Sequence, residues 1–204
     1  MASVQPELFR PLFNDVLEML SLTWQGFRRQ DGAALDTAVA LGRSIHKREK
    51  ELTEGLLAAP PDTEDLPFIP GHLERIGDAA HALVRDLRTM HAESIVFTDG
   101  GTREVNELFE RALELTQCAW DLTLTGNRVL ARHIEIGSMR FQDLASDFAH
   151  AHEERLIQGV CLPGSSSAYL GIMDHLREVV RHARRIGSRV SPRAGQSPTP
   201  TSPL

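Results

Sequence analysis

The chain has 204 residues, of which 41% are hydrophobic and 25% are charged, and its formal net charge is −6. A chain of this length can bury one large core or two small ones, and its acidic balance argues against a nucleic-acid-binding surface. Aromatic residues make up only 5%, which favours helices over sheets. Two cysteines, Cys118 and Cys161, are too few for a disulfide framework.

No targeting or membrane segment is predicted. The first ten residues lack a basic region followed by an apolar run, so we expect no signal peptide. No stretch approaches the roughly 18 uninterrupted apolar residues that a membrane span needs. The sequence therefore predicts a cytoplasmic protein with no membrane insertion.

Apolar residues recur at helical spacing through the first half of the chain, and they predict three helices there, over residues 8–29, about 33–58 and 67–91. Gln30-Asp31-Gly32 ends the first helix. Pro60-Pro61 ends the second, because proline lacks an amide hydrogen and clashes with the preceding turn. An acidic loop over 62–65 leads into the third.

The second half of the chain predicts three more helices, over about 103–125, 127–161 and 165–190. Asp99-Gly100-Gly101 is the predicted break between the halves. Pro163-Gly164 separates the last two helices, and the hydroxyls of 165–167 offer caps for the free amides of the sixth. Residues 191–204 are rich in Pro, Ser and Thr and predict a disordered tail.

Three pairs of segments repeat in the same order, which indicates an internal duplication. The first and fourth helices match at an offset of 96 positions, the second and fifth at 104, and the third and sixth at 103. Matching residues include Phe13 and Phe109, Trp24 and Trp120, His46 and His150, and His72 and His175. The pattern predicts an all-α fold of two tandem antiparallel three-helix bundles, over 8–95 and 102–190. Trp24 and Trp120 are expected to anchor the core, and Gly77 to permit a close helix approach.

A polar stripe on the third helix is the candidate functional site. Glu74 and Asp78 lie four residues apart, with His81 three further on, so all three share one helix face. Two carboxylates at this spacing repel each other, and a bound cation would remove that cost. His46 and Glu49 on the second helix could complete a site for a divalent or iron-type metal ion if the two helices face each other. The alternative interpretation is a solvated polar face.

The segment Leu73-Glu-Arg-Ile-Gly-Asp78 resembles the signature of the PhoU family, bacterial regulators of phosphate uptake built from two three-helix bundles. The run from Ile45 to Leu52 and the second half from His152 onward resemble PhoU-type domains at the cytoplasmic end of bacterial sodium/phosphate cotransporters. The resemblance covers roughly 8–190. It implies a non-enzymatic adaptor that contacts a phosphate transporter, a membrane histidine kinase, or both.

The resemblance also implies metal binding through an E(D)xxxD motif, whose carboxylates fall on Glu74 and Asp78. The second copy of the motif should lie on the sixth helix, where the matching residues are Arg177 and Arg181. We therefore expect at most one metal site, in the first bundle. Asp143, Asp147, His150 and Glu154 form a stripe on the fifth helix. If this stripe faces the sixth helix, the two arginines could replace the metal by pairing with its carboxylates. The alternative interpretation is ordinary surface salt bridging.

Two other classes of protein stay open at this point. A di-iron enzyme of the ferritin-like class needs Glu-x-x-His pairs in a four-helix core, and the chain contains no Glu-x-x-His. A metal-free helical scaffold or dimerisation module would tolerate changes at Glu74 and Asp78. The oligomeric state, including a homodimer, does not follow from the sequence. We predict a PhoU-like regulator of phosphate transport and signalling that is not an enzyme.

Overall fold

A computed structural model describes residues 6–58, 68–161 and 163–190, and all regular structure within these ranges is helical. The elements are a 3₁₀ helix, η1 (Pro6–Phe9), and six α-helices: α1 (Arg10–Arg29), α2 (Gly32–Leu57), α3 (Phe68–Ala92), α4 (Asp99–Thr125), α5 (Arg128–Ile157) and α6 (Pro163–Val190). The predicted all-α, six-helix fold is confirmed. None of the helices in these ranges is long and apolar enough to cross a membrane. The predicted acidic loop and C-terminal tail lie outside the described residues.

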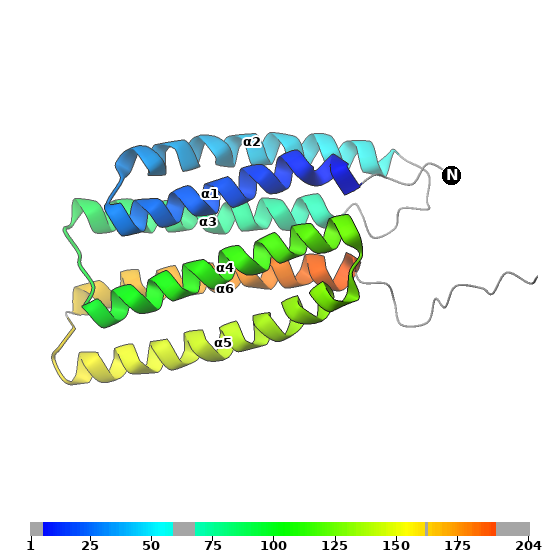
Figure 1. Cartoon of the computed structure of the whole chain (residues 1–204). Helices are drawn as coiled ribbons and strands as arrows, with labels where there is room; N and C mark the ends of the chain where they lie inside the picture. The colour runs from blue at the N-terminus through cyan, green and yellow to red at the C-terminus, as the bar shows by residue number, and fades with distance from the viewer. Residues whose placement is uncertain (1–5, 59–67, 162, 191–204) are drawn as a thin grey trace, which may run out of the picture.

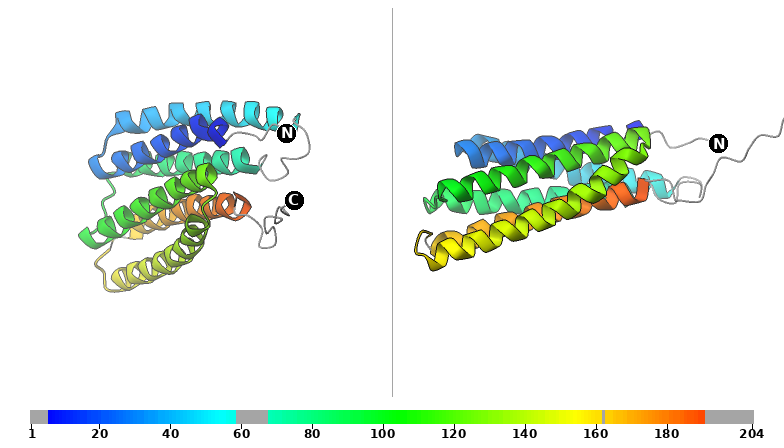
Figure 2. Two further views of the ribbon diagram at one scale, coloured as in Figure 1. Left: turned by 45° about the vertical axis from the view of Figure 1, so that its right-hand side comes forward. Right: turned by 60° about the horizontal axis from the view of Figure 1, so that its bottom comes forward.

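The six helices form two antiparallel three-helix bundles that lie side by side (Figure 1). α1, α2 and α3 form the first bundle, and α4, α5 and α6 the second. The bundles meet where α1 packs on α4 and, more extensively, where α3 packs on α6. α2 and α5 therefore lie on the two outer sides, as the views in Figure 2 also show.

One continuous core runs through both bundles. Its largest fully buried side chains come from both halves of the chain and include Phe9, Phe13, Phe109, Phe141 and Tyr169. Because the two halves share this core, each bundle covers an apolar face of the other. The predicted boundaries of two separate domains, 8–95 and 102–190, stay a prediction.

Two crossed aromatic contacts support the duplication. The rings of Phe13 and Trp120 have centroids 4.9 Å apart, and those of Trp24 and Phe109 are 6.3 Å apart and stacked. Phe13 corresponds to Phe109 in the repeat, and Trp24 corresponds to Trp120. Each contact therefore joins the phenylalanine of one half to the tryptophan of the other, as expected of two related halves that face each other. Trp120 is buried as expected of a core anchor, whereas Trp24 is only part-buried and donates its indole N–H to the Asn106 side chain at 2.7 Å.

The starts of α2 and α5 lie at an offset that differs from the one predicted for these helices. Gln30 and Gly126 end α1 and α4 in the left-handed conformation, with φ of 52° and 62°. Asp31 and Asn127, also 96 positions apart, then cap α2 and α5 by accepting a backbone N–H. α2 and α5 therefore begin at the same offset as α1 and α4, whereas the predicted match of His46 with His150 has an offset of 104.

Two predicted helix starts are wrong. The Asp99-Gly100-Gly101 segment is the first turn of α4 and not a break, because Thr98 caps this turn by accepting the Gly101 N–H at 3.1 Å. α6 begins at Pro163, since proline is tolerated where the helix needs no amide donor. The serines at 165–167 therefore lie within the first turns of α6 rather than before its start.

Two glycines bring neighbouring helices into close contact. A Cβ atom added to Gly77 of α3 would lie 3.1 Å from Ile45 Cγ2 of α2. A Cβ added to Gly187 of α6 would lie 3.2 Å from Ile134 Cγ2 of α5. The predicted role of Gly77 is confirmed, and the second bundle repeats the contact.

We expect Gly77→Leu to lower the free energy of unfolding by about 1–3 kcal/mol, because the new side chain must displace Ile45 in a packed interface. Gly55→Leu is the matched control, since nothing lies within 4 Å of a Cβ at that exposed position of α2. There the better helix propensity of leucine should raise stability by about 0.5 kcal/mol. Urea denaturation followed by circular dichroism measures both, and equal effects would contradict the contact.

Candidate functional site

The predicted metal-ligating residues lie in a groove between α2 and α3. This α2–α3 groove has a volume of about 360 Å³ and forms around the Ile45–Gly77 contact. Four of the five predicted ligands line it, namely His46, Glu74, Asp78 and His81. Glu49 is not among the lining residues, and its carboxylate instead accepts a hydrogen bond from Thr53 on the same helix at 2.8 Å.

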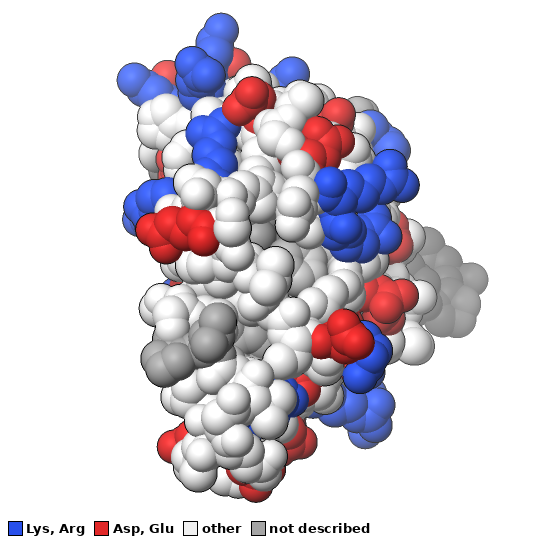
Figure 3. Space-filling view, turned by 90° about the vertical axis from the view of Figure 1, so that its left-hand side faces the viewer, with Lys and Arg blue, Asp and Glu red and all other residues white. Residues whose placement is uncertain are grey.

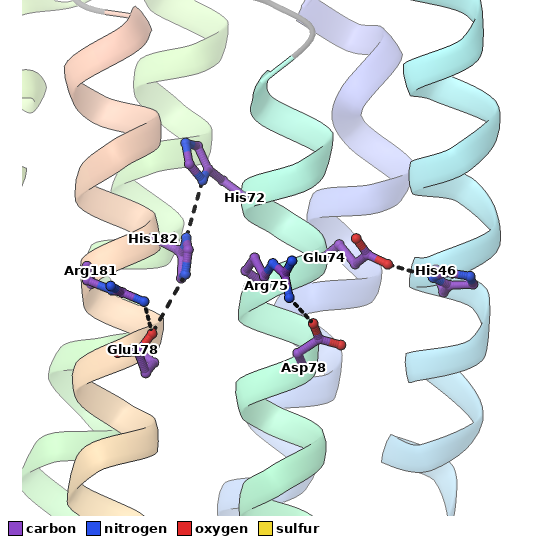
Figure 4. Close-up of polar contacts among 8 residues, drawn as sticks. All are labelled: His46, His72, Glu74, Arg75, Asp78, Glu178, Arg181 and His182. Atoms are coloured by element: carbon purple, nitrogen blue, oxygen red, sulfur yellow. Dashed lines mark hydrogen bonds and ion pairs between the residues drawn. The ribbon is translucent and has the colours of Figure 1, made fainter.

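The side chains of the α2–α3 groove are engaged with one another and with an arginine (Figure 4). The Nδ1 atom of His46 lies 2.5 Å from Glu74 Oε1, across the two helices. Asp78 accepts a hydrogen bond from Arg75 at 3.3 Å within α3. Among the described residues, no group of three or more His, Cys, Asp or Glu side chains is placed to hold a metal ion. As they lie, Glu74 and Asp78 are engaged by His46 and Arg75, and the metal site stays a prediction.

A counterpart of this groove lies between α5 and α6. The sequence His-x-x-Arg-Ile-Gly occurs at 72–77 in α3 and again at 182–187 in α6, an offset of 110 (187 − 77 = 110). On the facing helices, Ile45 corresponds to Ile134 at an offset of 89 (134 − 45 = 89). Each described residue that lines the α5–α6 groove has a counterpart in the α2–α3 groove at these two offsets. The sequence analysis missed this repeated motif, although it is visible in the residues themselves.

The second bundle is joined by an arginine, but not by the predicted ones. Arg177 pairs with Asp174, and Arg181 with Glu178, both within α6. The predicted pairing of these arginines with α5 is wrong, because carboxylates three residues earlier on the same helix are closer partners. His150 of the predicted stripe likewise pairs with Glu153 and Glu154 on its own helix.

The pair that does join α5 to α6 is Arg184 with Glu135. The guanidinium Nε and Nη2 atoms lie 2.7 and 2.5 Å from the two carboxylate oxygens, which is a bidentate geometry. These hydrogen bonds from Arg184 lower the pKa of Glu135. The positions correspond to Glu74 and His46 of the first bundle, so the cross-helix pair is kept, but its carboxylate comes from the outer helix in the second bundle and from α3 in the first.

A histidine pair lies where α3 packs on α6. The Nδ1 atoms of His72 and His182 are 3.2 Å apart, and both rings are part-buried (Figure 4). Burial lowers the pKa of both groups, and nearby arginines lower it further; His182 reaches about 4. Both imidazoles are therefore neutral at pH 7, and one donates an Nδ1–H to the other.

A buried polar cluster joins α4, α5 and α6 near the ends of these helices. Arg155 makes two hydrogen bonds to Glu104, at 2.8 and 2.6 Å, and the Tyr169 hydroxyl donates to the same carboxylate at 2.5 Å. His152 stacks on Tyr169 and lies 3.0 Å from the Ser166 hydroxyl. Burial raises the pKa of Glu104, but Arg155 and Tyr169 outweigh it and hold the pKa below its usual value. These contacts link the three helices of the second bundle. The sequence analysis missed the cluster because its residues come from three different helices.

The end of the molecule beside this cluster is largely uncharged at its centre. Figure 3 views this end, where charged side chains lie mostly toward the edges. Val96, Ile157 and Val160 are 70%, 80% and 58% exposed here. A cavity of about 190 Å³ lined by Phe97 and Tyr169, among others, opens beside them. Exposed apolar groups that gather in this way are typical of a surface that contacts another protein.

Comparison with known proteins identifies the fold. No protein-family model matches the sequence, and no curated protein matches it. PhoU from Pseudomonas aeruginosa matches the structure with a TM-score of 0.80 over 90% of this chain and 92% of that chain, at 18% sequence identity. The chain has the PhoU fold.

Two further structures, both from Shewanella oneidensis MR-1, agree with this result. A PhoU-like protein matches with a TM-score of 0.64 over 93% of this chain and 95% of its own, at 15% identity. A proposed PhoU-like phosphate regulatory protein matches with a TM-score of 0.64 over 90% and 95%, at 14% identity. The resemblance to PhoU inferred from residues 73–78 is therefore confirmed at the level of the fold.

The neutral state of His182 predicts a loss of stability in acid. The unfolded chain takes up a proton at the ordinary pKa of 6.5, whereas the folded protein does so only at about 4. Because the unfolded state binds more protons between these values, stability should fall as the pH drops from about 6.5 toward 4. His182→Gln should reduce this loss, while His150→Gln, at an exposed position, should not. Urea denaturation at pH 7 and pH 5 measures the difference, and equal pH dependence in all three proteins would contradict the assignment.

Removal of two carboxylates tests the predicted metal site. A divalent cation at a hundredfold excess over its Kd should stabilise chelator-treated protein by about 2–3 kcal/mol, because it binds only the folded state. Glu74→Ala/Asp78→Ala should abolish this effect, and Arg75→Gln should strengthen binding by freeing Asp78. Glu110→Ala/Asp147→Ala removes two exposed carboxylates elsewhere and should change nothing. Thermal unfolding and elemental analysis give the effect and its stoichiometry; stabilisation that persists in the first variant would rule out this site.

Proposed function

We propose that this protein is a cytoplasmic, non-enzymatic regulator of phosphate transport that acts by contact with a phosphate transporter, a membrane histidine kinase, or both. The observation that carries the proposal is the match to PhoU, which extends over nine-tenths of both chains. One of the two matched Shewanella proteins is described as a phosphate regulatory protein, and the motif at 73–78 carries the same resemblance.

Features of the surface support an adaptor. The exposed apolar centre at the end of the bundles, with Val96 and Ile157, suits contact with a partner protein. The α2–α3 groove offers a second, polar surface with His46 and Glu74 in contact. We propose that this groove takes a divalent cation through Glu74 and Asp78 when Arg75 releases Asp78, and that the groove takes part in regulation.

The proposal is tested by deletion of the gene in its source organism. We expect the deletion strain to keep phosphate uptake high after a shift from phosphate starvation to excess, because the transporter is no longer restrained. The wild-type gene should restore the decrease. Uptake that falls normally without the gene, or a sulfate uptake that changes equally, would contradict a role specific to phosphate.

The same strain separates the metal-dependent regulator from a plain scaffold. Glu74→Ala/Asp78→Ala should fail to restore regulation, whereas Glu110→Ala/Asp147→Ala, which removes the same charge from exposed positions, should restore it. Immunoblotting confirms that both variants accumulate to the wild-type level. Full restoration by the first variant would indicate a scaffold that needs neither carboxylate.

A further inference from the structure

The α5–α6 groove reproduces the shape of the α2–α3 groove with the opposite charge. It has a volume of about 400 Å³ and is built around the contact of Ile134 with Gly187. Where the first groove presents Glu74 and Asp78, the second presents Arg184 and Ser188. A groove of the same construction is therefore available to a ligand of the opposite sign.

The charges that line the α5–α6 groove do not cancel. Arg128, Arg132 and Arg184 contribute three guanidiniums, and Glu135 contributes one carboxylate. Glu135 is held by both of its oxygens in the pair with Arg184. Two positive charges therefore remain, in a protein whose formal net charge is −6.

The two remaining charges belong to arginines that have no partner among the residues that the structure describes. Arg128 and Arg132 lie one turn apart on α5, and neither makes a hydrogen bond, ion pair or ring contact with another residue of the described ranges. They lie near the start of α5, whose first turn contains no acidic residue. The partial positive charge of the helix start adds to theirs, and nothing in the described part of the chain neutralises either.

The position of each groove along its outer helix explains why the arginines lie at the start of α5. Ile45 is fourteen positions beyond Asp31, the cap of α2, whereas Ile134 is only seven beyond Asn127, the cap of α5. The groove of the second bundle thus lies two helical turns closer to the start of its outer helix. This shift brings the helix dipole and the unpaired guanidiniums to the same place.

We propose that the α5–α6 groove binds a phosphate-type dianion, either inorganic phosphate or the phosphate group of a monoester. Two unpaired guanidiniums one turn apart match the charge of a dianion and can donate several hydrogen bonds to its oxygens. Arg184 stays fixed by Glu135 and lines the opposite side of the groove. The site goes beyond the proposed regulatory function and does not depend on it.

Titration of the full-length protein with inorganic phosphate, and separately with glycerol 3-phosphate, tests the proposal. At constant ionic strength, the NMR signals of the arginine Nε–H groups of Arg128 and Arg132 should shift saturably. Arg128→Gln/Arg132→Gln should weaken binding at least about tenfold, because both charge-assisted donors are removed. Arg85→Gln/Arg140→Gln removes the same charge at exposed positions outside the groove and should leave affinity unchanged.

The outcomes separate the sources of the anion and can overturn the site. Equal affinity for the two probes would show that free phosphate is a sufficient ligand. A tenfold higher affinity for glycerol 3-phosphate would indicate that the natural ligand is a phosphorylated molecule. Absence of saturation with both probes overturns the proposal, as does equal weakening in the two double variants, which would indicate general charge attraction. Neither result bears on the uptake experiment, which involves the transporter.

Discussion

The close approach of helices at Gly77 and Gly187 is the constraint on which both grooves depend. With no side chain at these positions, Ile45 and Ile134 lie directly against the facing helix. Residues next to the contact are then near enough to interact across the groove, so that His46 meets Glu74 and Glu135 meets Arg184. A larger residue at either glycine would separate the helices and with them the polar pairs. The apolar contact therefore determines where polar chemistry can occur.

Given this shared construction, the two bundles differ mainly in electrostatics. Two carboxylates, two imidazoles and one arginine, Arg43, line the first groove, whereas three arginines and one carboxylate line the second. Exchange of charge at a surface groove costs little, because exposed side chains contribute weakly to folding. The buried contacts cannot change so freely, and the Ile–Gly pairs are the same in both halves. The two halves thus share one helix arrangement and present two grooves with differently charged linings.

The sequence was sufficient for the helices and insufficient for their register. Apolar spacing and prolines predicted six helices, and Phe13 and Trp24 located the repeat in α4 correctly, because large aromatic residues occur rarely by chance. Shorter matches such as His46 with His150 do not fix the register of a repeat, since the apolar seam of a helix looks alike after any shift of two turns. The caps Asp31 and Asn127 mark the starts of α2 and α5, and each follows a residue in the left-handed conformation, of which only Gly126 has the residue type that predicts it.

The candidate site could be predicted only in part, for a related reason. Helical spacing placed Glu74, Asp78 and His81 on one face, and the structure adds His46 from the facing helix. Spacing could not exclude Glu49, because the part of α2 that faces α3 depends on the packing of both helices. Spacing also could not show that Arg75 forms an ion pair with Asp78, or that Arg177 and Arg181 pair with carboxylates within α6. A long arginine side chain can reach several nearby carboxylates, and the three-dimensional packing determines which of them it pairs with.

The repeated His-x-x-Arg-Ile-Gly motif also explains how the two grooves are connected. In each copy the glycine packs on the outer helix of its own bundle, while the histidine faces the other bundle, so that His72 meets His182. One helix face thus lines a groove and another forms the interface between bundles. A rotation of α3 that moved Glu74 away from His46 would also move His72 against His182, because a helix turns as a rigid unit. Neutral, part-buried imidazoles at this contact keep the interface free of like-charge repulsion among the neighbouring arginines at pH 7. The geometry of each groove therefore rests on the same interface that holds the two bundles together.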